Sequence, residues 1–322
     1  MTVITGRRRL LAAAGALLAL AGCASLPVPD YRAGLGPLPA GRPARVELTD
    51  VPFFPQEDYQ CGPAALATVL QAAGIARTPE ELVEQVYLPQ RQGSLQVEML
   101  AGARRSGAVP YVLRGEPADL VRELAAGHPV VVLQNLRWRL LPQWHYAVVV
   151  GVDLAEGTVT LRSGTVRRLV MPLNEFDRSW ALADRWAFVA LPPDRLPASA
   201  REAEWVSAAA NFERVAPALG PRAYETALAA WPRNLLARLA LGNAAYRQRQ
   251  LGQAREHYAR ATREHPEAGD AWNNLAQVLF EQGERDPALQ AARRAVALGG
   301  PRADRYAATL GRIEAAGAPS SR

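Results

Sequence analysis

The chain has 322 residues, a formal net charge of +6 and a hydrophobic fraction of 49%. This length fits two modest domains, and the hydrophobic fraction is sufficient for ordinary cores. All 37 basic residues are arginine, and beyond the first few residues they are spread along the chain, with no nucleic-acid-binding motif among them. We therefore expect no nucleic-acid partner.

The first residues have the pattern of an export signal. The charged segment Arg7–Arg9 precedes an apolar run, Leu10–Ala21, that is too short to span a bilayer. The run ends in Leu20-Ala21-Gly22-Cys23, which resembles the bacterial lipobox. The resemblance implies that residues 1–23 form a lipoprotein signal peptide and that Cys23 is lipidated.

A lipidated Cys23 would anchor the protein in the bacterial cell envelope. The next residue is Ala24, where an Asp is associated with retention in the inner membrane, so we expect the periplasmic face of the outer membrane. The export route stays open between the general and the twin-arginine pathway, and an uncleaved N-terminal anchor would give a similar location. Residues 24–45, rich in Pro, Gly and Ala, are expected to be a tether.

Cysteine usage points to a chemical role for Cys61. The chain has 2 Cys, so a lipidated Cys23 leaves no partner for a disulfide. A single thiol then remains in an oxidising compartment. If Cys61 served only for packing, Ala or Val could occupy its position.

The sequence around Cys61 predicts that this residue opens a helix. Gly62 and Pro63 suit a first helical turn, and Leu66 and Leu70 give the helix a buried face. A helix N-terminus stabilises an anion and lowers the pKa of a thiol, which favours a nucleophile. The alternative is a small apolar core residue.

Residues 46–195 are predicted to form an α+β domain with early helices packed on a later antiparallel sheet. Thr78-Pro79-Glu80-Glu81 is a capping-box helix start. Further helices are expected over 96–105 and 117–126, and strands over 109–113, 130–133, 145–153, 158–161, 165–171 and 186–191.

Two stretches carry a specific resemblance. VPFFPQEDYQCGPAALATVL and HYAVVVGVD resemble the bacteriocin-processing (double-glycine leader) cysteine peptidase family and its stand-alone relatives, over residues 46–191. The resemblance implies a papain-like fold, with Cys61 as nucleophile and His145 as general base. Gln56 would donate a hydrogen bond to the oxyanion of the tetrahedral intermediate, and Gln60 is a second candidate for that role.

The sequence departs from this family at the third catalytic position. The family has an Asp at the end of the strand after the histidine strand, where this chain has Leu161–Gly164. Ser163 is the nearest possible orienter of the imidazole, and its hydroxyl brings no negative charge. Asp153 lies too far along the histidine strand and is expected in a turn.

The remaining histidines give no metal site. His128 precedes a proline in a predicted turn and is expected to be solvated, while His257 and His265 have no metal-ligand companions nearby in sequence. We expect no metal and no cofactor.

Residues 200–322 show a helical pattern with a 34-residue repeat. Leu241 and Leu275, Ala254 and Ala288, and Ala261 and Ala295 are related by this period. The pattern resembles the tetratricopeptide repeat (TPR), with a degenerate first repeat and a capping helix over 301–316. The resemblance implies an all-α solenoid that binds a protein partner; the alternative is a purely structural helical cap.

The favoured interpretation is an envelope-anchored cysteine peptidase that cleaves peptide bonds, with repeats that recruit a partner or substrate. Two alternatives stay open: a catalytically inactive adaptor lipoprotein, and an enzyme acting on cell-wall peptides. Specificity for double-glycine leaders is not expected, because the chain shows no transporter segment.

Overall fold

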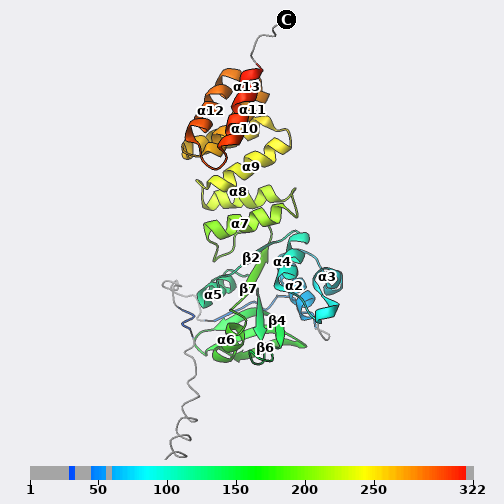
Figure 1. Ribbon diagram of the computed structural model, residues 1–322. Helices are drawn as coiled ribbons and strands as arrows, with labels where there is room; N and C mark the ends of the chain where they lie inside the picture. The colour runs from blue at the N-terminus through cyan, green and yellow to red at the C-terminus, as the bar shows by residue number, and fades with distance from the viewer. Residues whose placement is uncertain (1–28, 33–44, 56–59, 317–322) are drawn as a thin grey trace, which may run out of the picture.

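The computed structural model describes residues 29–32, 45–55 and 60–316 (Figure 1). The lipidation site expected at Cys23, the oxyanion donor expected at Gln56, the signal segment 1–23 and most of the segment 24–45 lie outside the described residues. Within them, the predicted order of an α+β domain followed by an all-helical region is confirmed.

An antiparallel sheet forms the centre of the first domain. Within the described part of the chain its strand order is β2-β7-β3-β4-β5-β6, and β1 pairs with the far end of β4. The strands are β1 (Arg45–Glu47), β2 (Val109–Val112), β3 (Val130–Asn135), β4 (Trp144–Asp153), β5 (Thr158–Ser163), β6 (Val166–Pro172) and β7 (Ala187–Leu191).

Gly151 on β4 makes room for β1. A Cβ atom at this position would lie 2.8 Å from the carbonyl oxygen of Val46, so a larger residue would push β1 off the sheet. The register between β4 and β5 also shifts between Val149 and Gly151, which places a bulge at this close approach.

Helices cover both faces of the sheet (Figure 1). On one face lie α2 (Cys61–Ala72), α3 (Pro79–Val86) and α4 (Gln96–Arg105), and on the other lie α5 (Pro117–Ala125) and α6 (Leu173–Ala181). A short 3₁₀ helix, Pro89–Arg91, lies between α3 and α4. Successive residues of β4 alternate between the two cores, with Tyr146 and Val148 facing α2 and Ala147 and Val149 facing the opposite side.

The predicted start of α3 is confirmed in detail. Thr78 Oγ1 accepts a hydrogen bond from the Glu81 backbone N–H, and the Glu81 carboxylate accepts one from the Thr78 N–H at 3.0 Å. This reciprocal pair satisfies two donors at the helix entrance. The expected helix over 96–105 also has the bounds of α4.

The second region is a series of antiparallel helices. They are α7 (Glu202–Glu213), α8 (Gly220–Ala230), α9 (Leu235–Arg247), α10 (Leu251–Glu264), α11 (Gly269–Glu281), α12 (Arg285–Leu298) and α13 (Ala303–Ala315). The repeated alanines Ala254, Ala261, Ala288 and Ala295 are fully buried, as expected where the helices of a repeat approach closely.

Gly242 provides a test of this helix packing. A Cβ atom there would lie 2.4 Å from the Tyr258 ring across the α9–α10 contact, so we expect Gly242→Ala to destabilise the protein by about 1–3 kcal/mol. The control is Gly252→Ala on α10, where an added Cβ atom would meet nothing within 4 Å apart from its chain neighbours and its own helix backbone; it should stabilise the protein by about 0.5–1 kcal/mol. Urea unfolding of both variants measures the difference, and equal midpoints would contradict this packing.

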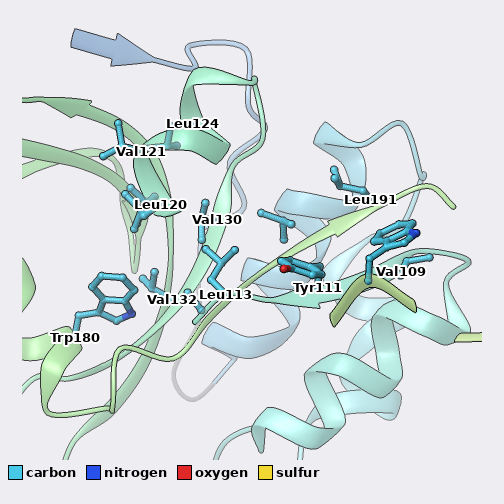
Figure 2. Packing of buried hydrophobic residues seen from close by; sticks show 14 of the residues in the cluster. Val109, Tyr111, Leu113, Leu120, Val121, Leu124, Val130, Val132, Trp180 and Leu191 are labelled. Atoms are coloured by element: carbon cyan, nitrogen blue, oxygen red, sulfur yellow. The ribbon is translucent and has the colours of Figure 1, made fainter. Parts of the chain in front are cut away.

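The hydrophobic core of the sheet continues into the helical region. Trp180 and Val189 from the sheet domain belong to the same buried cluster as Trp205 and Phe212 of α7 and Leu241 of α9. Figure 2 shows the sheet side of this cluster. The first helices therefore share a core with the sheet domain.

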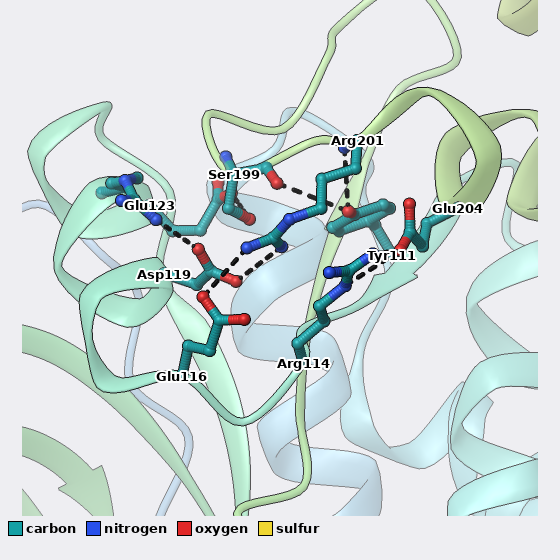
Figure 3. A network of polar contacts seen from close by, with 9 residues as sticks. Tyr111, Arg114, Glu116, Asp119, Glu123, Ser199, Arg201 and Glu204 are labelled. Atoms are coloured by element: carbon teal, nitrogen blue, oxygen red, sulfur yellow. Dashed lines mark hydrogen bonds and ion pairs between the residues drawn. The ribbon is translucent and has the colours of Figure 1, made fainter. Parts of the chain in front are cut away.

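A buried polar network holds the linker between β7 and α7 against α5 (Figure 3). The Glu123 side chain is fully buried and accepts hydrogen bonds from the backbone N–H groups of Ala198 and Ser199, at 3.2 and 2.7 Å, and from the Ser199 hydroxyl. Its other contact is His128, whose Nδ1 lies 2.7 Å away. The expectation that His128 is solvated was wrong, because its side chain is buried beside Glu123, which also binds the linker.

Candidate active site

A cavity of about 1050 Å³ opens between the N-terminal end of α2 and the start of β4. Cys61 and His145, 84 residues apart in the sequence, both line it. Its remaining lining comes from residues 91–96, the end of β3, residues 142–144 and 146, the β5–β6 turn and residues 183–184.

Cys61 is the first residue of α2. The preceding residue, Gln60, makes no side-chain cap to the helix, and it is not among the cavity-lining residues of the described chain. Among the described residues Cys61 is a free, partly buried cysteine. Its sulfur atom therefore lies at a helix N-terminus and beside a cavity.

His145 is the second residue of β4, and Ser163 is the last residue of β5. The β4–β5 pairing places Val148 opposite Arg162, which brings the start of β4 beside the end of β5. His145 Nε2 lies 2.8 Å from Ser163 Oγ. The position where the sequence has no carboxylate thus still gives the imidazole a hydrogen-bond partner.

Burial controls the protonation of both candidate residues. It raises the pKa of the Cys61 thiol, although backbone N–H groups, led by that of Tyr146, lower it in part. Burial also lowers the pKa of the His145 imidazole. The expectation of a lowered thiol pKa was wrong, because desolvation by the cavity wall outweighs the helix N-terminus. No hydrogen bond joins Cys61 and His145 within the described part of the chain.

Residues 48–186 match the model of the peptidase C39-like family, and residues 239–308 match that of the tetratricopeptide repeat. The two matches support a C39-like peptidase domain fused to tetratricopeptide repeats. No curated protein matches it.

Three solved structures similar to the C39-like domain each cover less than half of this chain. A protein described as a C39-like peptidase from Bacillus anthracis has 18% identity and a TM-score of 0.39, covering 46% of this chain and 97% of that chain. A double glycine motif protease from the AMS/PCAT transporter, in complex with the leader peptide, has 22% identity and a TM-score of 0.34, with coverages of 45% and 93%. The peptidase domain of Streptococcus ComA, a bi-functional ABC transporter of a quorum-sensing pathway, has 21% identity and a TM-score of 0.37, with coverages of 44% and 98%.

Two residues that line the cavity, Ser94 and Asp184, were not predicted from the sequence. The Ser94 hydroxyl is buried with no hydrogen-bond partner among the described residues, and a Cβ atom on Gly62 would lie 2.2 Å from it. Asp184, with a φ of 53°, adds a carboxylate to the cavity lining. Neither stands in a motif, and both reach the site through long-range folding.

A hairpin between β3 and β4 forms an apolar rim beside the cavity of the C39-like domain. The buried Asn135 holds it, since its Oδ1 accepts the backbone N–H groups of Arg137 and Gln143 at 3.1 and 3.0 Å. Large apolar side chains stand exposed on this hairpin: Trp138 (75%), Leu140 (93%), Leu141 (65%) and Trp144 (54%). The rim therefore offers apolar contact surface to a bound chain.

The contact between His145 and Ser163 makes a testable contribution. Ser163→Ala removes the only side-chain partner of the imidazole among the described residues, so we expect kcat to fall by about tenfold. Thr165→Ala is the matched control, because Thr165 also lines the cavity and makes no hydrogen bond with His145 among the described residues. Peptide cleavage rates measure the effect. An unchanged kcat in Ser163→Ala would show that Ser163 does not position the base.

Two further features, a metal-binding cluster and a membrane-spanning helix, are absent from the described residues. They contain no group of three His, Cys, Asp or Glu side chains placed to hold a metal ion. Their helices include none with the length and hydrophobicity needed to cross a membrane.

Proposed function

We propose that this protein is an envelope-anchored cysteine peptidase that cleaves peptide bonds through Cys61 and His145. The observation that carries the proposal is a single cavity lined by both residues, inside a domain matched by the peptidase C39-like family. The tetratricopeptide repeats recruit a protein partner or substrate to this domain. Lipidated Cys23 anchors the protein at the periplasmic face of the outer membrane.

In the proposed reaction, His145 accepts the thiol proton as the Cys61 sulfur attacks the scissile carbonyl carbon. The tetrahedral intermediate collapses when His145 gives that proton to the leaving amine, which leaves an acyl group on Cys61. Water, deprotonated by His145, then attacks the thioester, and the acid product leaves as Cys61 regains its proton. Gln56 and the Cys61 backbone N–H donate to the oxyanion.

The contact with Ser163 assigns a role to each nitrogen of the imidazole. When the Nε2 N–H donates to Ser163 Oγ, Nδ1 carries the lone pair that accepts the thiol proton. Because burial disfavours both charged forms, the resting pair is a neutral thiol and a neutral imidazole. Proton transfer therefore accompanies attack on the substrate rather than preceding it.

The test is cleavage of a peptide mixture of broad composition. Purified full-length protein in mild detergent is incubated with peptides from a digested bacterial proteome, and new termini are identified by mass spectrometry. We expect cleavage products that are absent with Cys61→Ala protein. The anchoring part is tested separately by labelling cells with an alkynyl fatty acid, where wild-type protein takes up label and Cys23→Ala protein does not.

A second candidate function is that of a catalytically inactive adaptor. Two observations favour it. Among the described residues the His145 imidazole has a hydroxyl partner and no carboxylate partner, and burial raises the pKa of the thiol. If wild-type and Cys61→Ala proteins give identical peptide mixtures, the adaptor function replaces the peptidase. Action on cell-wall peptides is distinguished by adding purified cell wall to the same assay.

A further inference from the structure

The tip of the hairpin between β3 and β4, residues 137–141, is the most exposed apolar feature of the described chain. Leu140 and Trp138 are 93% and 75% exposed, the highest values among its exposed large apolar side chains. The turn is well formed, because the Leu141 backbone N–H donates to the Trp138 carbonyl oxygen at 3.1 Å. The fold thus holds these side chains out in solvent, which is unfavourable unless a partner removes them from water.

The hairpin tip lies beside the cavity of the C39-like domain without belonging to its lining. Among the rim residues Trp144 lines the cavity, whereas Trp138, Leu140 and Leu141 do not. A peptide bound at Cys61 would therefore meet Trp144 and leave the tip uncovered. The helical region begins at the β2 edge of the sheet, three strands from β4, where α7 contacts β2 (Figure 1). It leaves the tip exposed as well.

Two arginines, Arg137 and Arg139, flank the tryptophan of the tip. Both are exposed, and their side chains make no ion pair or hydrogen bond among the described residues. The surrounding sequence adds no negative charge, since residues 124–152 contain neither Asp nor Glu. Unpaired arginines beside Trp and Leu are typical of surfaces that enter the interface of an anionic bilayer, where Trp lies at the headgroup level.

The N-terminal segment brings such a bilayer within reach. Residues 29–32 are fixed on the C39-like domain, because the Tyr31 side chain is buried and its hydroxyl donates to Asp177 Oδ1 at 3.2 Å. With Cys23 lipidated, as proposed above, the eight residues from there to Tyr31 span at most about 29 Å. A lipid on Cys23 would therefore keep the C39-like domain itself close to the membrane surface.

We propose that the hairpin tip inserts into the interface of an anionic phospholipid bilayer. Leu140 and Leu141 enter the acyl region, and Trp138 lies at the level of the headgroups. Arg137 and Arg139 pair with lipid phosphates. The cavity beside the tip then opens at the lipid surface. This inference rests on the anchoring proposed above and does not depend on peptidase activity.

Quenching of tryptophan fluorescence by brominated lipids tests this contact. Full-length protein is transferred from detergent into vesicles of phosphatidylethanolamine and phosphatidylglycerol, with or without bromine on the acyl chains, and flotation identifies vesicle-bound protein. All 7 tryptophans lie in the described residues, and Trp138 is the most exposed of them. We expect brominated lipids to quench wild-type emission. Leu140→Glu should reduce the quenching at least about twofold, because a charge in the acyl region is costly.

Two further variants serve as controls. Leu236→Glu, at an exposed position of α9, introduces the same charge in the helical region and should leave the quenching unchanged. Arg137→Gln/Arg139→Gln should reduce the quenching more on these anionic vesicles than on uncharged phosphatidylcholine vesicles, because the arginines are attracted to the negative surface.

The possible failures are distinguishable. Floating protein without quenching, or with equal quenching in wild type and Leu140→Glu, would overturn the inference and leave the anchor in place. Protein that does not float would overturn the anchor and the inference together. Slower peptide cleavage by Leu140→Glu, in the absence of quenching, would overturn the inference by assigning the tip to substrate binding. The peptide-cleavage assay of the Cys61 variants is independent of each of these results.

Discussion

Replacing either member of the Cys61–His145 pair should reduce peptide cleavage by a factor on the order of a thousand or more. The two side chains act in one step, since the thiol becomes a nucleophile only as the imidazole takes its proton. For the same reason the double variant Cys61→Ala/His145→Ala should cleave peptides no more slowly than Cys61→Ala alone. Rates on a peptide found in the mixture assay measure all three variants.

A control for this set is His257→Ala. His257 lies on α10, outside the cavity of the C39-like domain, and its removal should leave the cleavage rate within about twofold of wild type, because distant surface changes have small effects. If His145→Ala retained most of the wild-type rate while Cys61→Ala did not, another group would be the base. Asp184, which also lines the cavity, would then be the first residue to replace.

Replacing the buried Glu123 should cause the largest loss of stability. Glu123→Ala leaves two backbone N–H groups and His128 without partners, so we expect a loss of about 3–5 kcal/mol in the free energy of unfolding. Urea unfolding followed by tryptophan fluorescence measures it, since Trp180 and Trp205 lie in the adjoining core.

The matched control is Glu116→Ala on the same network. Glu116 pairs with Arg201 at 2.9 Å, and its side chain is 51% exposed, so its removal should cost less than about 1 kcal/mol. Equal effects of the two substitutions would contradict the role given to the buried carboxylate. A loss confined to Glu123→Ala would show that the linker depends on this contact (Figure 3).

The elements specified by local sequence were predictable. The capping box at Thr78 and Glu81 fixes the start of α3 through contacts three residues apart. The apolar run after His145 predicted β4, because a strand that is buried on both faces is a continuous apolar run in the local sequence. Cys61 was placed at a helix start by Gly62 and Pro63, which act within one turn.

The elements that depend on distant partners were not predictable in this way. β1 is three residues long and exists through its pairing with Val152 and its neighbours on β4. His128 pairs with Glu123, which also binds Ser199 of the linker, 71 residues further along the chain than His128. For α6, the signal was present in the spacing of Phe176 and Trp180, which a helix places on one buried face.

In the candidate site, too, some features were predictable from the sequence and others depend on distant contacts. Residue types and their order predicted the pair Cys61 and His145, and the alignment of β4 with β5 gives the contact of His145 with Ser163. The direction of the thiol pKa could not be predicted, because it depends on how much water the cavity wall removes. Ser94, whose hydroxyl has no hydrogen-bond partner among the described residues, belongs to a segment that shows no sequence motif.

The central claim is that His145 activates Cys61, and the pH dependence of iodoacetamide alkylation tests it most directly. As the pH is raised, the alkylation rate of Cys61 in wild-type protein should increase at a pH below 6.5, where the imidazole with its lowered pKa loses its proton. The rate should then stay level. It should rise again only above pH 9.0, where the thiolate itself forms. His145→Ala protein should lack the first rise and react at least about tenfold more slowly at pH 7. Identical profiles for the two proteins would contradict the account.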